Sequence, residues 1–248
     1  MPAPNSQRKF SHQDQYSGYM EVIFNTIKRE IKAPAKILDI PAGFGHLGDT
    51  LRQLGHEVVS ADINEERKDY VQVNMEFKLP FDDASFDVVI SMEGIEHVIN
   101  QTALINELVR VTKPSGLICV STPNASNFWS RLTYLFTGYF YQFKPSQFQV
   151  AKPNVMIDKG HISPITLYHL GYEMAVAGAG LKAATGDRFK KKFLMPLALL
   201  VFPFAYFSAQ DQAKKLPLEM VSDAGGTARY FNLNVFLSRT LIAYFIKR

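Results

Sequence analysis

The chain has 248 residues, of which 47% are hydrophobic, and this is enough for one large α/β domain with a full core. Its formal net charge of +4 is only mildly basic, so a nucleic-acid partner is not expected. The single cysteine, Cys119, excludes an internal disulfide, a CxxC metal site and a redox pair. The polar first residues carry no secretory signal, so we expect a cytoplasmic protein.

The first half of the chain predicts alternating strands and helices. Helical spacing of apolar residues indicates an N-terminal helix over 16–31. Strands are expected at 36–40, 57–61, 86–91 and 117–121. Helices are expected at 46–54 and 101–111, and a further helix is expected to begin at Glu65 with Asn64 as its N-terminal cap. Short strands that are apolar throughout and separated by helices are typical of a parallel sheet covered on both faces. The sequence therefore predicts a doubly wound α/β fold.

The second half of the chain is less regular. A helix is expected after the turn at 159–164, with Leu167, Leu170 and Met174 on its apolar face. Two more strands are expected at 181–187 and 240–246.

A glycine-containing turn, Asp-Ile-Pro-Ala-Gly-Phe-Gly at 39–45, follows the first strand. Such a turn before a helix N-terminus is a general nucleotide-binding device. It lacks the three-glycine spacing of a nicotinamide fingerprint and the Gly-Lys-Ser/Thr of a triphosphate loop. Asp39 would repel a pyrophosphate but attract a cationic amino-acid group. S-adenosylmethionine carries an ammonium and a sulfonium and no phosphate, so the turn favours it over NAD.

A second acid, Asp62, ends the second strand, where a carboxylate can accept both hydroxyls of a ribose. A turn-capping Asp39 or a helix-capping Asp62 would each be ordinary. The two acids together, each at the end of a neighbouring strand, favour a nucleoside ligand.

With three further segments, 58–64, 74–87 and 88–98, this turn resembles the successive cofactor motifs of class I S-adenosylmethionine-dependent methyltransferases. The nearest branch is the ubiquinone-biosynthesis type of O-methyltransferase and its relatives in cell-surface and small-molecule pathways. The resemblance covers about residues 35–125. It implies a Rossmann-like, mostly parallel seven-stranded sheet whose last strand is antiparallel.

The same resemblance implies one methyltransferase domain over 1–248. Its cofactor-binding core would be 35–125, its acceptor-pocket or lid region 126–180, and an apolar insertion before the last strand 188–235.

The resemblance also implies roles for individual residues. Asp39 and the turn would face the amino-acid end of the cofactor, and Asp62 would hold the ribose with Ile63 against the adenine. Asn74 and Met75 stand where the family often has Asp-Leu, so recognition of the adenine edge would use the Asn74 amide. The other cofactor residues expected by position are Pro41, Ala42, Gly43, Gly45 and Met92. Pro41 replaces the usual first glycine of the turn.

Glu93, Glu96 and His97 follow the fourth strand and would share one face of a helix that began there. They could bind a divalent cation, and the resemblance implies magnesium, which also suits oxygen ligands. Alternatively, His97 takes a proton from an acceptor hydroxyl while a glutamate orients it, or the group is structural. His161 is a further candidate base, or a structural loop histidine.

Two segments of the second half are unusually apolar. The aromatic-rich stretch 123–148 is expected to form a lid or wall for an aromatic or lipid-like acceptor, or a buried helix pair. The run 193–207 has 15 residues without a charge and basic residues on both sides. It is too short to span a bilayer, and prolines interrupt it. Contact with an anionic membrane surface or a lipid substrate is favoured, with a core helix or a homodimer contact as alternatives.

The features together predict methyl transfer from S-adenosylmethionine to an oxygen of a small-molecule acceptor. That acceptor would be a quinone precursor, a polyketide or a lipid-linked sugar. C- or N-methylation and a non-catalytic, cofactor-binding scaffold are the alternatives.

Overall fold

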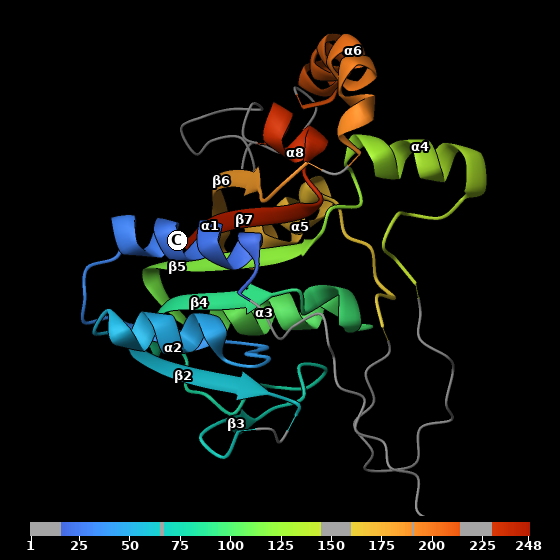
Figure 1. The fold of residues 1–248 in the computed structure, drawn as a ribbon. Helices are drawn as coiled ribbons and strands as arrows, with labels where there is room; N and C mark the ends of the chain where they lie inside the picture. The colour runs from blue at the N-terminus through green and yellow to red at the C-terminus, as the bar shows by residue number, and fades with distance from the viewer. Residues whose placement is uncertain (1–15, 65–66, 145–159, 190, 214–229) are drawn as a thin grey trace, which may run out of the picture.

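The computed structural model describes residues 16–64, 67–144, 160–189, 191–213 and 230–248, which fold around one seven-stranded sheet (Figure 1). The strand order is β3-β2-β1-β4-β5-β7-β6. The strands are β1 (Lys36–Asp39), β2 (Glu57–Asp62), β3 (Val71–Gln72), β4 (Phe86–Met92), β5 (Thr112–Pro123), β6 (Ala179–Gly186) and β7 (Thr240–Lys247). The first five strands pair in parallel, whereas β7 lies antiparallel between β5 and β6. The predicted doubly wound sheet and its antiparallel last strand are confirmed.

Helices cover both faces of the sheet. They are α1 (Gly18–Glu30), α2 (His46–Gln53), α3 (Gln101–Val111), α4 (Phe128–Thr137), α5 (Leu167–Val176), α6 (Met195–Ala213) and α8 (Leu233–Leu237), with 3-10 turns η1 (Ile95–His97) and η2 (Lys192–Leu194). Neighbouring residues of a strand point to opposite faces, so Ile37 packs against α1 and α2 while Leu38 packs with α3 and α5. Two apolar clusters thus lie on opposite faces of the sheet, beneath the helices that cover it in Figure 1.

Two local predictions are wrong. The segment after Asn64 does not form the predicted helix, because residues 67–70 are turns that lead into β3; Glu65 and Glu66 lie outside the described residues. Strand β5 begins at Thr112, before the predicted start at 117. Pro114-Ser115-Gly116 does not break this strand but shifts its register against β4, with Ser115 at φ 60°.

The apolar run forms a longer helix than predicted. Helix α6 continues past residue 207 to Ala213 and contains Pro203, while Pro196 lies in its first turn, where a proline removes no helical hydrogen bond. Among the described residues, Lys192–Gln212 is long and apolar enough, by length and composition alone, to cross a membrane. The prediction that the run is too short for this is therefore wrong. Helices α4, α6 and α8 gather at one end of the molecule, beyond the sheet (Figure 1).

Candidate functional site

The glycine turn lies at the carboxyl edge of the sheet, between β1 and α2. The Ala42 amide donates to the carbonyl of Ala61 on β2, at 3.0 Å, and the Gly43 amide donates to Asp62 Oδ2, at 2.7 Å. Gly43 and Gly45 have φ values of 54° and 81°, which other residues rarely adopt. The turn is thus fixed to the end of β2, where the second predicted cofactor acid stands.

Asp39, the acid before this turn, is fully buried at the end of β1. Among the described residues, neither of its carboxylate oxygens receives a hydrogen bond of good geometry. Burial, with the charge of Asp62 as a second cause, raises the pKa of Asp39 to about 7. Helix α2 approaches this carboxylate through Gly48, where a Cβ would lie 3.1 Å from Asp39 Oδ2. A cationic group bound at the turn would compensate this buried acid, so the site fits the ammonium of an amino-acid ligand.

Asp62 holds backbone groups with both of its oxygens. Oδ2 accepts from the Gly43 amide and Oδ1 from the Asn64 amide, at 3.0 Å. The backbone of Ile63 and the side chain of Asn64 also hydrogen-bond this carboxylate. Asp62 therefore fixes the end of β2 to the glycine turn, and it stands where the predicted contact to a nucleoside would be.

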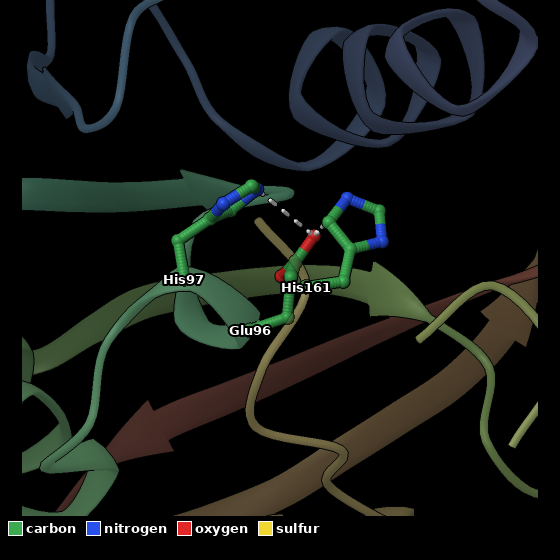
Figure 2. A group of neighbouring side chains, drawn as sticks. All are labelled: Glu96, His97 and His161. Carbon is green, nitrogen blue, oxygen red and sulfur yellow. Dashed lines mark ion pairs between the residues drawn. The ribbon is translucent and has the colours of Figure 1, made fainter. Parts of the chain in front are cut away.

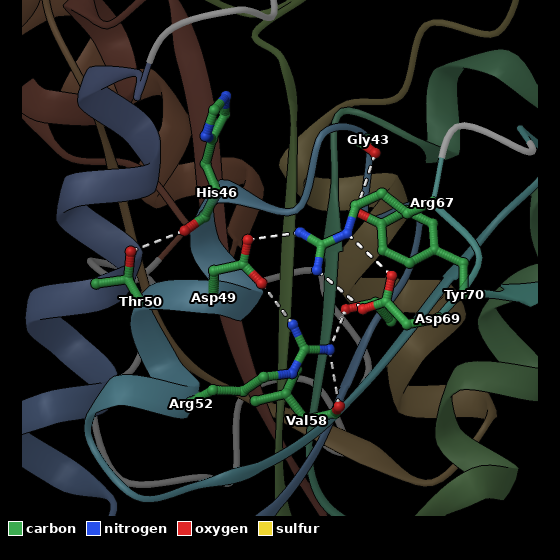
Figure 3. Close-up of polar contacts among 10 residues, drawn as sticks. Gly43, His46, Asp49, Thr50, Arg52, Val58, Arg67, Asp69 and Tyr70 are labelled. Atoms are coloured by element: carbon green, nitrogen blue, oxygen red, sulfur yellow. Dashed lines mark hydrogen bonds and ion pairs between the residues drawn. The ribbon is translucent and has the colours of Figure 1, made fainter.

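Residues 67–70 fold back over the glycine turn, as Figure 3 shows. Arg67 Nη1 pairs with Asp49 on α2 at 2.5 Å, and Tyr70 donates its hydroxyl hydrogen to the Gly43 carbonyl at 3.1 Å. A Cβ on Gly45 would lie 2.5 Å from both Arg67 Nη1 and the Tyr70 hydroxyl oxygen. Sequence reasoning missed Arg67 and Tyr70 because it placed a helix here. The arginine and tyrosine directly after β2 were the available signal.

The other residues predicted to contact the cofactor divide into two groups. Asn74 Oδ1 accepts from the Glu76 amide at 3.0 Å, which leaves its NH₂ group for a ligand. Met75 packs toward Gly94, where a Cβ would lie 3.3 Å from Met75 Cε and 2.4 Å from Pro41 Cδ. Met92, in contrast, is buried in the core on the α1 and α2 side of the sheet. Ile63 is half-buried beside the end of β2.

The acidic and histidine cluster differs from the predicted one. No helix begins at Glu93, which has φ 47° and precedes the short turn η1, so Glu93, Glu96 and His97 do not share a helical face. The group that converges is Glu96, His97 and His161 (Figure 2). Glu96 Oε1 lies 3.9 Å from His97 Nε2 and 4.0 Å from His161 Nε2. In this set His161 takes the place that the sequence prediction gave to Glu93.

Backbone contacts bring His161 to this position from a distant part of the chain. The Glu96 carbonyl accepts from the amides of Ile162, at 3.0 Å, and Ser163, at 3.1 Å. Glu96 Oε2 accepts from the Thr122 hydroxyl on β5 at 3.1 Å. The loop that carries His161 is thereby fixed to η1, at the carboxyl edge of β4 and β5.

The tautomer of His161 follows from its partner. His161 Nδ1 lies 2.9 Å from the Gln142 carbonyl oxygen, which can only accept, so Nδ1 carries the hydrogen. In the neutral ring Nε2 therefore has a lone pair, and this atom lies 4.0 Å from Glu96 Oε1. His161 is thus arranged as a proton acceptor, with Glu96 placed to stabilise its charged form.

Glu93 occupies a separate position near this cluster. Its Oε1 is shielded from solvent, and burial raises the pKa of its carboxyl above the ordinary value, while Arg239 opposes this shift. Burial, followed by the charge of Glu93, raises the pKa of Tyr19 on α1 to about 12, so this phenol keeps its hydrogen. Tyr19 and Arg239 were not predicted as site residues. An aromatic residue in an N-terminal helix and an arginine before a last strand gave no distinctive signal.

A hollow lies beside Arg239, between the first turns of α4 and α6. Its lining combines aromatic and apolar side chains with two cations, and includes Trp129, Tyr141, Lys191, Leu194 and Arg239. Arg239 donates to Gln142 Oε1 at 2.7 Å, and the Gln142 carbonyl holds His161. The hollow and the histidine cluster are therefore linked through Gln142.

The strand order, the antiparallel β7 and the glycine turn after β1 define the class I methyltransferase fold. Residues 38–120 match the family described as a methyltransferase domain. This segment is therefore similar to a methyltransferase domain, and the fold around it is of the class I type, whose methyl donor is S-adenosylmethionine.

Similar proteins agree with this family. A probable S-adenosylmethionine-dependent methyltransferase of Mycobacterium tuberculosis is 33% identical over 37% of this chain and 37% of its own length. A ubiquinone biosynthesis O-methyltransferase of Xanthomonas oryzae is 32% identical over 37% of this chain and 44% of its own. The chain thus aligns with less than half the length of these relatives. A solved methyltransferase from Archaeoglobus fulgidus shares the fold, with a TM-score of 0.55, 16% identity and coverage of 92% of this chain and 94% of that one.

Proposed function

We propose that the protein transfers a methyl group from S-adenosylmethionine to an oxygen of a small-molecule acceptor. One observation carries this proposal: the Glu96, His97 and His161 cluster stands at the same edge of the sheet as the glycine turn. The two are joined where Gly94, just before η1, packs against Pro41 of the turn. A proton acceptor therefore lies next to the place where a methyl donor would bind.

Residues of the turn would hold the donor. Asp39 offers a buried carboxylate to the ammonium, the backbone of Gly43 and Gly45 allows close approach, and Asp62 stands at the end of β2, where the ribose would lie. The cofactor supplies a methyl group on a positively charged sulfur, which makes the methyl carbon electrophilic. The protein then contributes mainly the position of the acceptor and the removal of its proton.

In this proposal the acceptor hydroxyl loses its proton as its oxygen bonds to the methyl carbon. The carbon–sulfur bond breaks, and its electron pair remains on sulfur as a neutral thioether. His161 Nε2 takes the hydroxyl proton, and the Glu96 carboxylate, 4.0 Å away, stabilises the imidazolium. His97 lies on the other side of the same carboxylate, at 3.9 Å, and could act in the same way.

The names of the relatives support an acceptor class. A phenolic, quinone-like compound is what a ubiquinone biosynthesis O-methyltransferase and a demethylmenaquinone methyltransferase suggest. A polyketide or a lipid-linked acceptor is the alternative. C- or N-methylation would not need the histidine cluster as a base for a hydroxyl.

A second candidate role for the cluster is to hold a metal ion. One ligand atom from each of Glu96, His97 and His161 can be chosen so that all lie within 4.8 Å of one another. Two imidazoles and one carboxylate suit zinc, iron or manganese better than the magnesium that the sequence resemblance implied. Such an ion would polarise an acceptor hydroxyl.

Chelation separates the two roles. Methyl transfer from labelled S-adenosylmethionine to a catechol-type quinone precursor is measured before and after dialysis against EDTA, and after addition of Zn²⁺ or Mn²⁺. Activity that resists EDTA supports the proton-acceptor role, and activity lost and restored by one ion supports the metal role. Protein that binds S-adenosylhomocysteine, yet labels neither this precursor nor any compound of a cell extract, would contradict the proposed function and support a scaffold role.

A further inference from the structure

Helix α6 is apolar on two opposite faces. Its inner side chains, Ala198, Phe202 and Tyr206, recur at every fourth position and pack against α4 and α8. Its outer face carries Leu200, 68% exposed, and Phe204, 75% exposed, together with Leu197, Val201 and Phe207. A helix that is hydrophobic all round is normally enclosed by protein or lipid. Only 6% of the most apolar 18-residue stretch within 192–212 is buried in the protein.

Helix α4 adds a second apolar surface at the same end of the molecule (Figure 1). Leu135 is 72% exposed and Phe136 is 80% exposed, and Tyr139 just beyond the helix is also exposed. Helices α4 and α6 are held together by one apolar cluster, in which Leu132 of α4 and Phe202 of α6 pack around Phe236 of α8. Large apolar side chains that are exposed side by side mark an interaction surface.

Charge indicates the kind of partner. Arg188, Lys191 and Lys192 are exposed just before α6, and residues 191–210 contain no acid. The Lys191 ammonium lies 5.1 Å from the centre of the Trp129 ring, on the first turn of α4. Cations at one end of an exposed apolar helix are complementary to the anionic headgroups and acyl chains of a membrane surface. Arg188 also pairs with Asp187 at 3.6 Å, so Lys191 and Lys192 are the cations that an anionic surface would attract most directly.

The inner packing determines how the helix meets the membrane. Phe202 stacks on Phe231 with ring centres 5.8 Å apart and planes at 10°. This contact fixes α6 to the rest of the domain, and a helix inserted across a bilayer would lose it. The geometry is therefore that of a helix lying along the surface with its outer face in the lipid.

We propose that the outer faces of α4 and α6 dock the protein on an anionic membrane surface. Leu200, Phe204 and Phe136 enter the acyl boundary, and Lys191 and Lys192 contact the headgroups. This docking does not depend on the proposed methyl transfer. It would place the hollow beneath α6 close to the lipid.

Vesicle flotation of the full chain tests the proposal, with vesicles of phosphatidylcholine alone and of phosphatidylcholine mixed equally with phosphatidylglycerol. The protein is expected to float with the mixed vesicles, more strongly at low than at high salt. The double variant Leu200→Glu with Phe204→Glu should weaken binding at least about tenfold. Lys191→Glu with Lys192→Glu should remove the preference for the anionic lipid.

Phe77→Glu is the matched control, because Phe77 is 70% exposed on a loop far from α6 in sequence, and it should bind vesicles like the unchanged protein. The folding of each variant is checked by circular dichroism. Emission of the single tryptophan, Trp129, should shift to the blue with mixed vesicles. Failure of the unchanged protein to float with either vesicle would overturn the proposal. So would a dimer in light scattering that Phe204→Glu dissociates while vesicle binding stays absent.

Discussion

The carboxylate of Asp39 lies buried beneath the glycine turn, without a hydrogen bond of good geometry from the described residues. Its pKa of about 7 lies above the ordinary value of 3.8, mainly because of burial. The charged form therefore lowers the stability of the folded protein. This cost is absent below about pH 4, grows between pH 4 and 7, and is complete above pH 7. A bound cation at the turn would remove it.

Asp39→Asn should therefore separate stability from binding. At pH 8 the variant should be more stable than the unchanged protein by about 1–2 kcal/mol, and at pH 4 this difference should vanish. Its affinity for S-adenosylhomocysteine should fall about 30-fold or more, because the ammonium loses its counter-charge. Thermal denaturation at both pH values and calorimetry measure the two effects. Unchanged affinity would show that Asp39 only supports the turn.

Gly45 tests how closely residues 67–70 cover the turn. Gly45→Ala should lower the free energy of unfolding by about 2–4 kcal/mol, because of both its φ of 81° and a Cβ 2.5 Å from Arg67 Nη1 and the Tyr70 hydroxyl. Gly138→Ala is the control, since Gly138 has φ +73° and no atom within 4 Å of an added Cβ. It should cost only about 1 kcal/mol. Equal losses in urea denaturation would mean that Arg67 and Tyr70 do not restrict Gly45.

At the scale of elements, the short turn η1 and the loop before α5 act as one unit. The Glu96 carbonyl accepts from the amides of Ile162 and Ser163, and the Gln142 carbonyl orients His161. Three separate segments thus position one imidazole. Its Nε2 lies 4.0 Å from Glu96 Oε1, and the Nε2 of His97 lies 3.9 Å from the same oxygen.

His161→Ala should reduce kcat about 100-fold or more and leave the affinity for S-adenosylhomocysteine unchanged, because in the proposed function His161 takes a proton and does not hold the cofactor. His169→Ala is the matched control. His169 lies on the exposed side of α5, and its side chain pairs with Glu173 of the same helix at 3.3 Å. Initial rates with labelled donor measure both variants. A His161→Ala enzyme of normal kcat would exclude this histidine as the base and leave His97.

Elements with strong periodicity were predicted well from sequence. The helix at 101–111 has the predicted bounds, and β1, β4 and α2 lie within two residues of theirs. The local pattern determined these elements because each helix buries one apolar face and each strand is apolar on both faces. The turns at 67–70 were missed because long-range contacts, from Arg67 to Asp49 and from Tyr70 to Gly43, replaced a helix that the local residues favoured.

At the scale of the whole molecule, sequence alone placed the glycine turn at the end of the first strand but did not predict the full histidine cluster. Asp39 and Asp62 end adjacent strands, so their proximity follows from parallel pairing. His161 is 64 residues from His97 in the sequence, and no local pattern joins them. The two histidines are brought together by the contacts of the Ile162 and Ser163 amides with the Glu96 carbonyl. The sequence showed that the run 193–207 is apolar. It did not show that the helix continues through Pro203 to Ala213.

The most direct test of the account is transfer of a ¹³C-methyl group from S-adenosylmethionine, followed by mass spectrometry and NMR of the product. The unchanged protein is predicted to place the label on a hydroxyl oxygen of a quinone-like acceptor. The Glu96→Gln variant should bind S-adenosylhomocysteine normally and transfer the label about 100-fold more slowly, because the imidazolium loses its counter-charge. Label on carbon or nitrogen, or equal rates for the two proteins, would contradict the account.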